Sequence, residues 1–262
     1  FQDARLFPHL TVRQNLGYGR WLAGIRDGAE FDRIVDMLGI GPLLPRRPGA
    51  LSGGERQRVA LGRAILSAPR ILLMDEPLAA LDEARKAEIL PYLERLRDEV
   101  GLPILYVSHS LAEVARLATT VVLLEAGRVT AAGPVAEVLS DPGTAAALGL
   151  RDAGAVLQAR IEAQEEEDGL TRLITGAGPV WLPRIEGAPG RNLRLRILAQ
   201  DVMLALSPPQ GVSALNHLPA VVEEVRLGDG PGALVRLRAG DEALLARITR
   251  RSARVMELRP GL

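Results

Sequence analysis

The chain has 262 residues, of which 47% are hydrophobic and 24% charged, and its formal net charge is zero. This balance is typical of a globular protein and gives no reason to expect a nucleic-acid partner held by bulk positive charge. Because there is no cysteine, disulfides, thiolate metal sites and a cysteine nucleophile are excluded. No apolar run reaches the ~18 residues of a membrane span.

The first part of the chain is predicted to combine short helices with an α/β segment. Residues 3–50 contain TVRQNLGYG and FDRIVDMLGI, whose apolar residues recur at helical spacing, and a Pro/Gly-rich connector follows. A helix is expected over 53–67, after two glycines. The apolar run ILLMD at 71–75 is typical of a buried parallel strand.

The α/β alternation continues beyond this strand. A helix is expected to begin near Asp82, a good N-cap residue, and to kink or restart at Pro91. The run PILYVS at 103–108 predicts a second buried strand, followed by a helix over 110–118. TVVLLEAGRVTAAG then predicts two strands joined by a turn at the Ala-Gly pair 126–127.

The pattern changes near residue 150. Short runs such as AVLQARI, NLRLRIL and ALVRLRA alternate apolar and polar residues, with Gly, Pro and Asp between them. Strands with this period predict a small antiparallel β-barrel domain over 151–262. The acidic run 165–168 is expected at a solvated hairpin tip, and the similar layouts of 154–176 and 218–240 suggest a duplicated unit.

Two carboxylates follow the strand ILLMD directly. Asp75 and Glu76 lie at its carboxyl end, where open α/β sheets bind ligands. Asp75 can hold a Mg²⁺ ion through water, and Glu76 can polarise an attacking water molecule. A simple strand-end turn would also place an Asp-Glu pair here, so the assignment depends on neighbouring motifs.

LSGGERQR, at 51–58, is such a motif. Ser52 and two glycines lie where a helix begins, so backbone N–H groups and the helix dipole point at one spot, and the glycines let a phosphate approach closely. This arrangement predicts an anion site. The phosphate-binding loop G-x-x-x-x-G-K-[ST] does not occur, because the single lysine, Lys86, follows Arg85.

Three motifs together resemble those of ATP-binding-cassette (ABC) ATPases. LSGGERQRVALGRA is similar to their signature motif, ILLMDEPLAALD to their Walker B strand and D-loop, and YVSHS to their switch-histidine loop. One mild departure is alanine at 79–80, where family members usually carry a serine. The resemblance covers residues 1–145 and implies an α/β P-loop-type ABC ATPase domain, incomplete from the Q-loop onward, with a helical subdomain at 3–50.

The resemblance also accounts for the Phe-Gln pair at the start of the chain. Gln2 matches the glutamine of the family's Q-loop, and in these proteins the phosphate-binding loop precedes it. We therefore expect the chain to begin after its own Walker A motif, and residues 1–262 alone to be unable to hydrolyse ATP.

The resemblance implies a role for each matching residue in binding and hydrolysing ATP with Mg²⁺. Glu76 would be the general base, His109 the γ-phosphate switch, and Gln2 a contact to Mg²⁺ or to the attacking water. Asp75 would support Mg²⁺, and Asp82 would couple two sites across a dimer. The residues that would clasp ATP held on a partner subunit are Ser52, Gly53, Gly54 and Gln57.

The segment after Gln2 is most similar to the ATPase subunits of molybdate importers. In those proteins the region corresponding to 3–50 meets a subunit in the membrane. Four apolar side chains are candidates for this contact, or equally for a small internal core: Leu6, Phe7, Leu10 and Val12.

The C-terminal segment resembles a second importer domain. SALNHLPAVVEEV and ALLARITRRSARVMELRPG are similar to the Mop type of the small OB-like TOBE domain, an all-β domain that is expected here to lack its last strand. Ser213 and Asn216 match the stretch that contributes to oxyanion sites in that family. The alternative is that both residues form a turn before a strand.

The leading hypothesis is an ATPase subunit that powers import of an oxyanion, molybdate or tungstate. Its expected partners are a second copy, integral membrane permease subunits bound through 3–50, and indirectly an extracytoplasmic oxyanion-binding protein, with no nucleic acid. Its expected place is the cytoplasmic face of the plasma membrane. The alternatives are an oxyanion sensor with a vestigial ATPase half, the ATPase of a sulfate, iron or polyamine importer, and a soluble ABC ATPase of DNA repair or translation.

Overall fold

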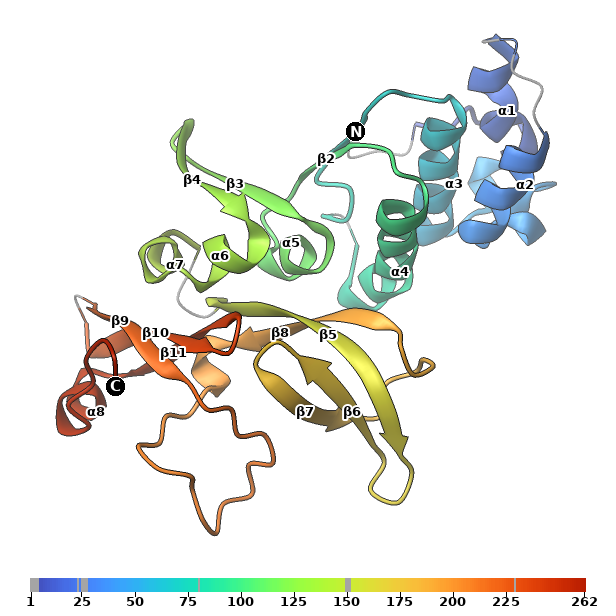
Figure 1. The fold of residues 1–262 in the computed structure, drawn as a ribbon. Coiled ribbons are helices and arrows are strands. Elements are labelled where there is room, and N and C mark those ends of the chain that lie inside the picture. The colour runs from blue at the N-terminus through green and yellow to red at the C-terminus, as the bar shows by residue number, and fades with distance from the viewer. Residues whose placement is uncertain (1–4, 23, 25–27, 80, 149–151, 229) are drawn as a thin grey trace. The chain divides into compact units, whose positions relative to one another are not determined.

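The computed structural model describes residues 5–22, 24, 28–79, 81–148, 152–228 and 230–262 (Figure 1). The predicted Q-loop residue Gln2 lies outside these ranges, as does Ala80. The chain divides into two compact units, Phe1–Glu113 (unit 1) and Val114–Leu262 (unit 2). The predicted boundary near residue 150 stays a prediction.

Unit 1 contains a group of helices and a parallel pair of strands. Its elements are α1 (Val12–Leu22), α2 (Gly28–Met37), two 3-10 turns (Gly41–Leu43, Pro48–Ala50), α3 (Gly53–Leu66), β1 (Leu72–Asp75), α4 (Glu83–Glu99), β2 (Ile104–Val107) and the start of α5 (Leu111–Leu117). The helices predicted at 53–67 and 110–118 and both predicted strands are therefore confirmed, but neither strand is buried on both faces, since Leu73 and Leu105 are 64% and 56% exposed.

The helices α1 and α2 pack against α3 (Figure 1). Leu16 on α1 and Ile34 on α2 are fully buried, as is Val59 on α3. Gly62 makes this close approach possible, since a Cβ there would lie 3.0 Å from Leu16 Cδ2 and 3.1 Å from Leu38 Cδ1. The described part of residues 5–50 thus has its own apolar core on α3.

The strands β1 and β2 run parallel, with Leu72 opposite Ile104 and Asp75 opposite Val107. Their carboxyl ends therefore lie at one edge of the sheet, followed by the residues predicted to carry the chemistry.

The helix α4 tests one of the two outcomes predicted at Pro91. It runs unbroken from Glu83 to Glu99 with Pro91 inside it, so a restart is wrong, while a kink stays a prediction. Proline removes only the hydrogen bond to the carbonyl four residues earlier. Buried side chains on both sides of Pro91, Ile89 and Leu93, hold the two halves of α4 in place.

Unit 2 opens with the predicted hairpin. It consists of β3 (Thr120–Glu125) and β4 (Arg128–Pro134), joined at Ala126 and Gly127, whose φ values are +49° and +76°. Two consecutive positive φ values are the signature of a tight hairpin turn, so this prediction is confirmed. The helices α6 (Val135–Ser140) and α7 (Pro142–Leu148) follow.

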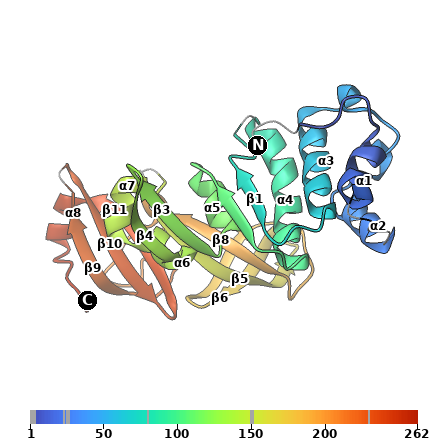
Figure 2. The same ribbon diagram turned by 90° about the horizontal axis from the view of Figure 1, so that it is seen from above.

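Two antiparallel sheets form the rest of unit 2 (Figure 2). The first has the order β7-β6-β5-β8 and the second β11-β10-β9. The bounds are β5 (Gly154–Glu165), β6 (Leu170–Thr175), β7 (Gly178–Pro183), β8 (Asn192–Leu198), β9 (Val221–Leu227), β10 (Gly232–Ala239) and β11 (Glu242–Thr249), followed by α8 (Arg250–Val255). The alternating runs form strands as predicted, and the acidic run 165–168 lies at the β5–β6 turn.

The two sheets share one apolar core. Leu157 on β5, Val235 on β10 and Ala246 on β11 belong to a single buried cluster and are fully buried. The strand β7 was not among the predicted runs, because prolines at both ends of GPVWLP obscure its alternation.

The suggested duplication has a structural counterpart. Each sheet contains a three-stranded meander, β5-β6-β7 and β9-β10-β11, and equivalent glycines, Gly176 and Gly240, occupy the last turn of each. The two turns touch: Gly240 has a φ of +56°, and a Cβ there would lie 2.1 Å from the Gly176 carbonyl oxygen.

Candidate functional site

The edge where β1 and β2 end brings Glu76 and His109 together. Glu76 Oε1 lies 3.2 Å from His109 Nδ1, although 33 residues separate them. The Glu76 N–H donates to the carbonyl of Val107 at 2.9 Å, which continues the strand pairing by one residue. The carboxylate and the imidazole therefore form a pair set by the register of the two strands.

The backbone of Glu76 is unusual. Its φ is +44°, in the left-handed region that non-glycine residues seldom adopt. Its carbonyl accepts a hydrogen bond from Ala79 N–H at 3.2 Å, which holds the turn. Such a conformation costs about 1–3 kcal/mol, and in this chain it also occurs at the β3–β4 turn, at Ala126.

Asp75 is the last residue of β1 and is exposed. Among the described residues, no hydrogen bond or ion pair engages its carboxylate, and no group of three His, Cys, Asp or Glu residues forms a metal site. A Mg²⁺ ion bound here would depend on other ligands, such as phosphate oxygens and water, as this ion commonly does. The single free carboxylate fits that arrangement.

The N-terminus of α3 is closed by a capping box. The Ser52 N–H donates to Glu55 Oε2 at 2.6 Å, and the Glu55 N–H donates to Ser52 Oγ at 3.2 Å. The hydrogen bond from the Ser52 backbone holds the pKa of Glu55 below its ordinary value, with a smaller contribution from Arg46. Ser52 is exposed, so its hydroxyl can still donate to a ligand.

The two glycines after Ser52 are not required by packing within the chain. A Cβ at Gly53 would make ordinary contacts, 3.5 Å from Arg85 Nη1, and one at Gly54 would lie 3.8 Å from Ile89 Cδ1. Glycine in a helix weakens it relative to alanine. Packing within unit 1 therefore does not explain either glycine, although Gly54 itself is buried.

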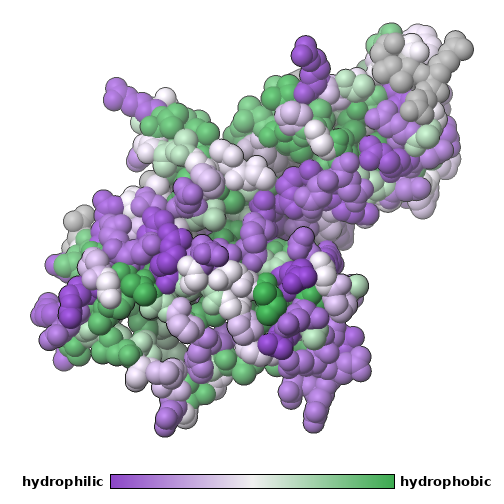
Figure 3. Space-filling model, in the orientation of Figure 1, coloured by the Kyte–Doolittle hydropathy of each residue, from purple (hydrophilic) through white to green (hydrophobic). Residues whose placement is uncertain are grey.

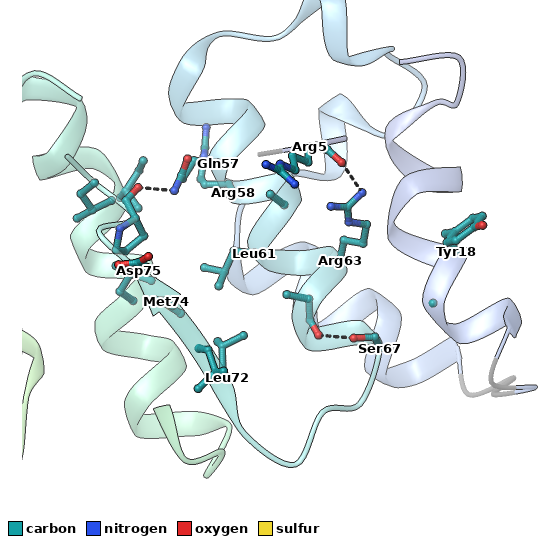
Figure 4. Close-up of a pocket in the computed structure, with 18 of the residues that line it drawn as sticks. Arg5, Tyr18, Gln57, Arg58, Leu61, Arg63, Ser67, Leu72, Met74 and Asp75 are labelled. Carbon is teal, nitrogen blue, oxygen red and sulfur yellow. Dashed lines mark hydrogen bonds between the residues drawn. The ribbon is translucent and has the colours of Figure 1, made fainter. Parts of the chain in front are cut away.

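Two further predicted site residues link the elements of unit 1. The Gln57 side-chain amide donates to the carbonyl of Pro77, next to Glu76, and so ties α3 to the turn after β1 (Figure 4). Asp82 caps α4: its Oδ1 accepts the Arg85 N–H at 2.9 Å. The structure thus brings Gln57 to the Glu76 turn and places Asp82 at the start of α4.

Three comparisons with known proteins bear on this site. A family model described as ABC transporter matches residues 1–79, and one described as TOBE domain matches residues 212–262. The molybdenum import ATP-binding protein ModC of Rhizobium meliloti (strain 1021) is 55% identical over all 262 residues, which covers 73% of that protein. The protein of the same name from Methylococcus capsulatus (Bath) is 52% identical over 263 residues, again covering 73% of it.

The chain belongs to the family of molybdenum import ATP-binding proteins. As a family member it is an ABC-type ATPase subunit that binds ATP, which confirms the family and the enzyme class predicted from the motifs. A solved structure, a dimeric bacterial ABC transporter cassette, aligns with 52% of this chain at 28% identity. The alignment covers 61% of the cassette's own chain and has a TM-score of 0.43.

In this ModC family member, a cavity of about 460 Å³ lies between α1, α3 and β1 (Figure 4). Asp75 lies at one end of it, and Phe7, Tyr18 and Leu61 are among its lining residues. Burial lowers the pKa of Arg63, whose guanidinium lies 5.4 Å from the centre of the Phe7 ring. The motifs gave no sign of this cavity.

Sequence reasoning also missed the residue that orders the segment before α1. Asn15 is fully buried: its Oδ1 accepts the Phe7 N–H at 2.8 Å, and its Nδ2 donates to the Phe7 carbonyl at 3.1 Å and the Thr11 carbonyl at 3.0 Å. Of the four apolar candidates for a membrane-partner contact, Val12 is fully buried and belongs to the core. The other three are partly exposed.

The predicted oxyanion residues of unit 2 lie in the segment before β9. Asn216 has both amide atoms engaged, since its Oδ1 accepts the Trp181 N–H at 2.7 Å and its Nδ2 donates to the Trp181 carbonyl at 2.9 Å. Ser213 is exposed, and the hydrogen bonds of Asn216 go to Trp181 and not to Ser213. The oxyanion site stays a prediction. The side-chain amide of Asn216, one of its two predicted residues, is already hydrogen-bonded to the backbone of β7.

Proposed function

We propose that the chain is the ATP-hydrolysing subunit of a membrane importer for molybdate. The observation that carries this proposal is the 55% identity of the whole chain to a molybdenum import ATP-binding protein. The relatives from Rhizobium meliloti and Methylococcus capsulatus both carry the name of a molybdenum importer, which supports this reading over the other importer and sensor alternatives.

In the proposed reaction, Glu76 accepts the proton of a water molecule whose oxygen attacks the γ-phosphorus of ATP. The bond from that phosphorus to the bridging oxygen breaks, and ADP leaves. His109 acts through its 3.2 Å contact to Glu76, which orients the carboxylate and places the imidazole beside the attack site. The strand register and the positive φ of Glu76 keep this pair in position before ATP binds.

Mg²⁺ is the proposed cofactor, and it would neutralise charge on the phosphates when bound. Asp75 would hold it through water, because its carboxylate is exposed at the same sheet edge as Glu76. Gln2, the remaining proposed ligand, lies outside the described residues.

A second copy of the chain is the proposed partner at the signature segment. Ser52 and the exposed side of Gly53, at the N-terminus of α3, would offer N–H donors to the γ-phosphate of ATP on that copy, with the buried Gly54 in the same turn. Asp82, at the start of the adjacent helix α4, would couple the two sites. Gln57 would act from the next turn of α3.

The proposed membrane partners are permease subunits that contact the segment 3–50. On α1, the side chains of Trp21 and Leu22 are 75% and 65% exposed, an apolar surface suited to such a contact. None of the helices in the described ranges is long and apolar enough to span a membrane. We propose a peripheral position on the cytoplasmic face, with an extracytoplasmic oxyanion-binding protein as an indirect partner.

The test is made on the protein as expressed from its own gene, together with its permease. Glu76→Gln is expected to lower ATP turnover by about 10²–10⁴-fold, since it removes a general base while keeping the side chain's shape. Uptake of labelled molybdate by cells should fall in parallel, and uptake of sulfate should not depend on the protein. The matched control is Glu83→Gln, an exposed carboxylate at the start of α4.

Two results would contradict the proposal. One is full ATP turnover by the Glu76→Gln protein, and the other is molybdate uptake that does not depend on the protein.

A further inference from the structure

Lys86, the single lysine of the chain, lies on α4 close to its start. Its side chain is only 16% exposed, and its Nζ lies 3.1 Å from Glu83 Oε1 and 3.4 Å from Glu113 Oε1. The two carboxylates differ sharply, because the Glu83 side chain is 89% exposed and that of Glu113 only 5%. The contact to Glu113 is therefore the one made away from water.

Glu113 is the one buried carboxylate among the described residues. Its Oε2 accepts hydrogen bonds from the Tyr106 hydroxyl and from Ser108 Oγ, both at 2.8 Å. Burial of a charge is costly unless the charge is paired and hydrogen-bonded. Here one ammonium group and two hydroxyl groups meet that requirement, and they come from α4 and from the end of β2.

The residues of this cluster lie on both sides of His109 in the sequence, and Ser108 is its direct neighbour. Ser108 precedes the histidine, and its Oγ accepts the Ser110 N–H at 3.0 Å on the other side of it. The His109 side chain is 73% exposed, and its recorded polar contact is the one to Glu76. The position of the imidazole therefore depends on the backbone that the buried cluster holds.

We propose that the Lys86–Glu113 ion pair is a positioning device that ties the loop carrying His109 to the first turns of α4. This inference rests on the proposed function, because it assigns His109 and the start of α4 to the ATPase site. Neither member of the pair touches the nucleotide. The pair instead keeps the switch histidine and the D-loop end of α4 in one rigid arrangement.

The protonation states of the cluster suit this role. Hydrogen bonding to Glu83 and the charge of Glu113 raise the pKa of Lys86, so the ammonium form is favoured. Burial raises the pKa of Tyr106, and the adjacent Glu113 raises it further, so the hydroxyl remains a donor. The groups facing Glu113 are thus one cation and two neutral donors.

Hydrogen exchange measures the positioning directly. Glu113→Gln places a neutral amide beside Lys86 with almost no change in shape, and should speed exchange of the Ser110 N–H by about tenfold, the effect of losing one charge-assisted hydrogen bond. Glu83→Gln, which removes the exposed partner of the same lysine, should change it less than twofold. Equal effects of the two variants would overturn the inference.

Kinetics of the protein expressed from its own gene separate positioning from simple stabilisation. Glu113→Gln and Lys86→Met should each lower kcat for ATP by about tenfold or more with KM for ATP unchanged, whereas Lys86→Arg should retain most of the rate. The double variant Lys86→Met, Glu113→Gln should be no slower than Lys86→Met alone, because the buried carboxylate is then no longer unpaired.

The two proposals fail in different ways. If Glu76→Gln leaves hydrolysis unchanged, the proposed function fails whatever Glu113→Gln does to the Ser110 amide. If Glu76 is essential but Glu113→Gln only lowers the melting temperature, with exchange at Ser110 and kcat unchanged, the ion pair is structural and the positioning role is wrong.

Discussion

The two units differ in where a carboxylate is buried. In unit 1 the buried carboxylate of Glu113 forms an ion pair with Lys86, whose side chain is 16% exposed. In unit 2 the cluster between the sheets is apolar, and charged pairs such as Arg172–Glu162 at 2.9 Å and Arg236–Glu223 at 3.1 Å lie outside it on strand faces. The difference indicates what a substitution should change in each unit. In unit 2, loss of a core side chain should lower the free energy of unfolding. In unit 1, loss of a buried ion pair should change the position of a loop.

The surface of unit 2 adds to this contrast. The β3–β4 hairpin exposes Val122, Leu124 and Val129, an apolar surface that Figure 3 shows in green. Exposed apolar patches commonly mark contact surfaces. Apolar side chains therefore form the core of unit 2, and on the β3–β4 hairpin they also form an exposed surface that a partner could cover.

The largest expected effect is on the core of unit 2. Leu157→Ala should lower the free energy of unfolding of this unit by about 2–5 kcal/mol, since Leu157 is fully buried between the sheets. Urea denaturation followed by the fluorescence of Trp181, in a background with Trp21→Phe, reports on unit 2. Leu206→Ala is the control, because Leu206 is 66% exposed and its loss should cost under about 0.5 kcal/mol.

A smaller loss is expected where the two meanders touch. Gly240→Ala should destabilise unit 2 by about 2–3 kcal/mol, combining the cost of a positive φ with a contact of 2.1 Å to the Gly176 carbonyl. Gly211→Ala isolates the first cost, since Gly211 has a φ of +69° but open space around it. If the two variants lose equal stability, the contact between the turns is unimportant.

The smallest change in stability is expected in unit 1, and it has the opposite sign. Gly54→Ala should leave unfolding unchanged or raise its free energy by up to about 0.5 kcal/mol, because alanine favours a helix and the added Cβ meets Ile89 at 3.8 Å. ATP turnover should nevertheless be lost if this backbone contacts phosphate. Both are measured on the same preparation, by chemical denaturation and by phosphate release.

Gly62→Ala, in the same helix, is the matched control for that variant. Its Cβ would lie 3.0 Å from Leu16 Cδ2, so it should destabilise unit 1. A Gly54→Ala protein that keeps full turnover would show that the signature glycine has no role in catalysis.

Local patterns predicted much of the fold. ILLMD and PILYVS gave both strands of unit 1, and the period-2 runs gave most strands of unit 2, because burial on one or both faces leaves a direct trace in sequence. The choice between a kink and a restart at Pro91 could not be made from sequence, because it depends on packing by Ile89 and Leu93. The strand β7 was missed because its prolines hide a short alternation.

The candidate site was predicted less completely. Motifs identified Glu76 and His109, and the structure brings them to 3.2 Å. Glu113 and Asn15 were missed, since a glutamate in LAEVARL and an asparagine in TVRQN look like ordinary helix-surface residues. What distinguishes them is burial and hydrogen bonding to distant parts of the chain, such as Lys86, 27 positions before Glu113. Such contacts follow from the fold and not from local pattern.

The paired amide of Asn216 has a consequence for β7, the outermost strand of its sheet. An outer strand presents free N–H and carbonyl groups that can recruit a strand from another molecule. At Trp181 both groups are already satisfied by one side chain, at 2.7 and 2.9 Å, much as a neighbouring strand would satisfy them. The segment before β9 therefore covers this edge at Trp181, and blocks edge-to-edge pairing with a second molecule there.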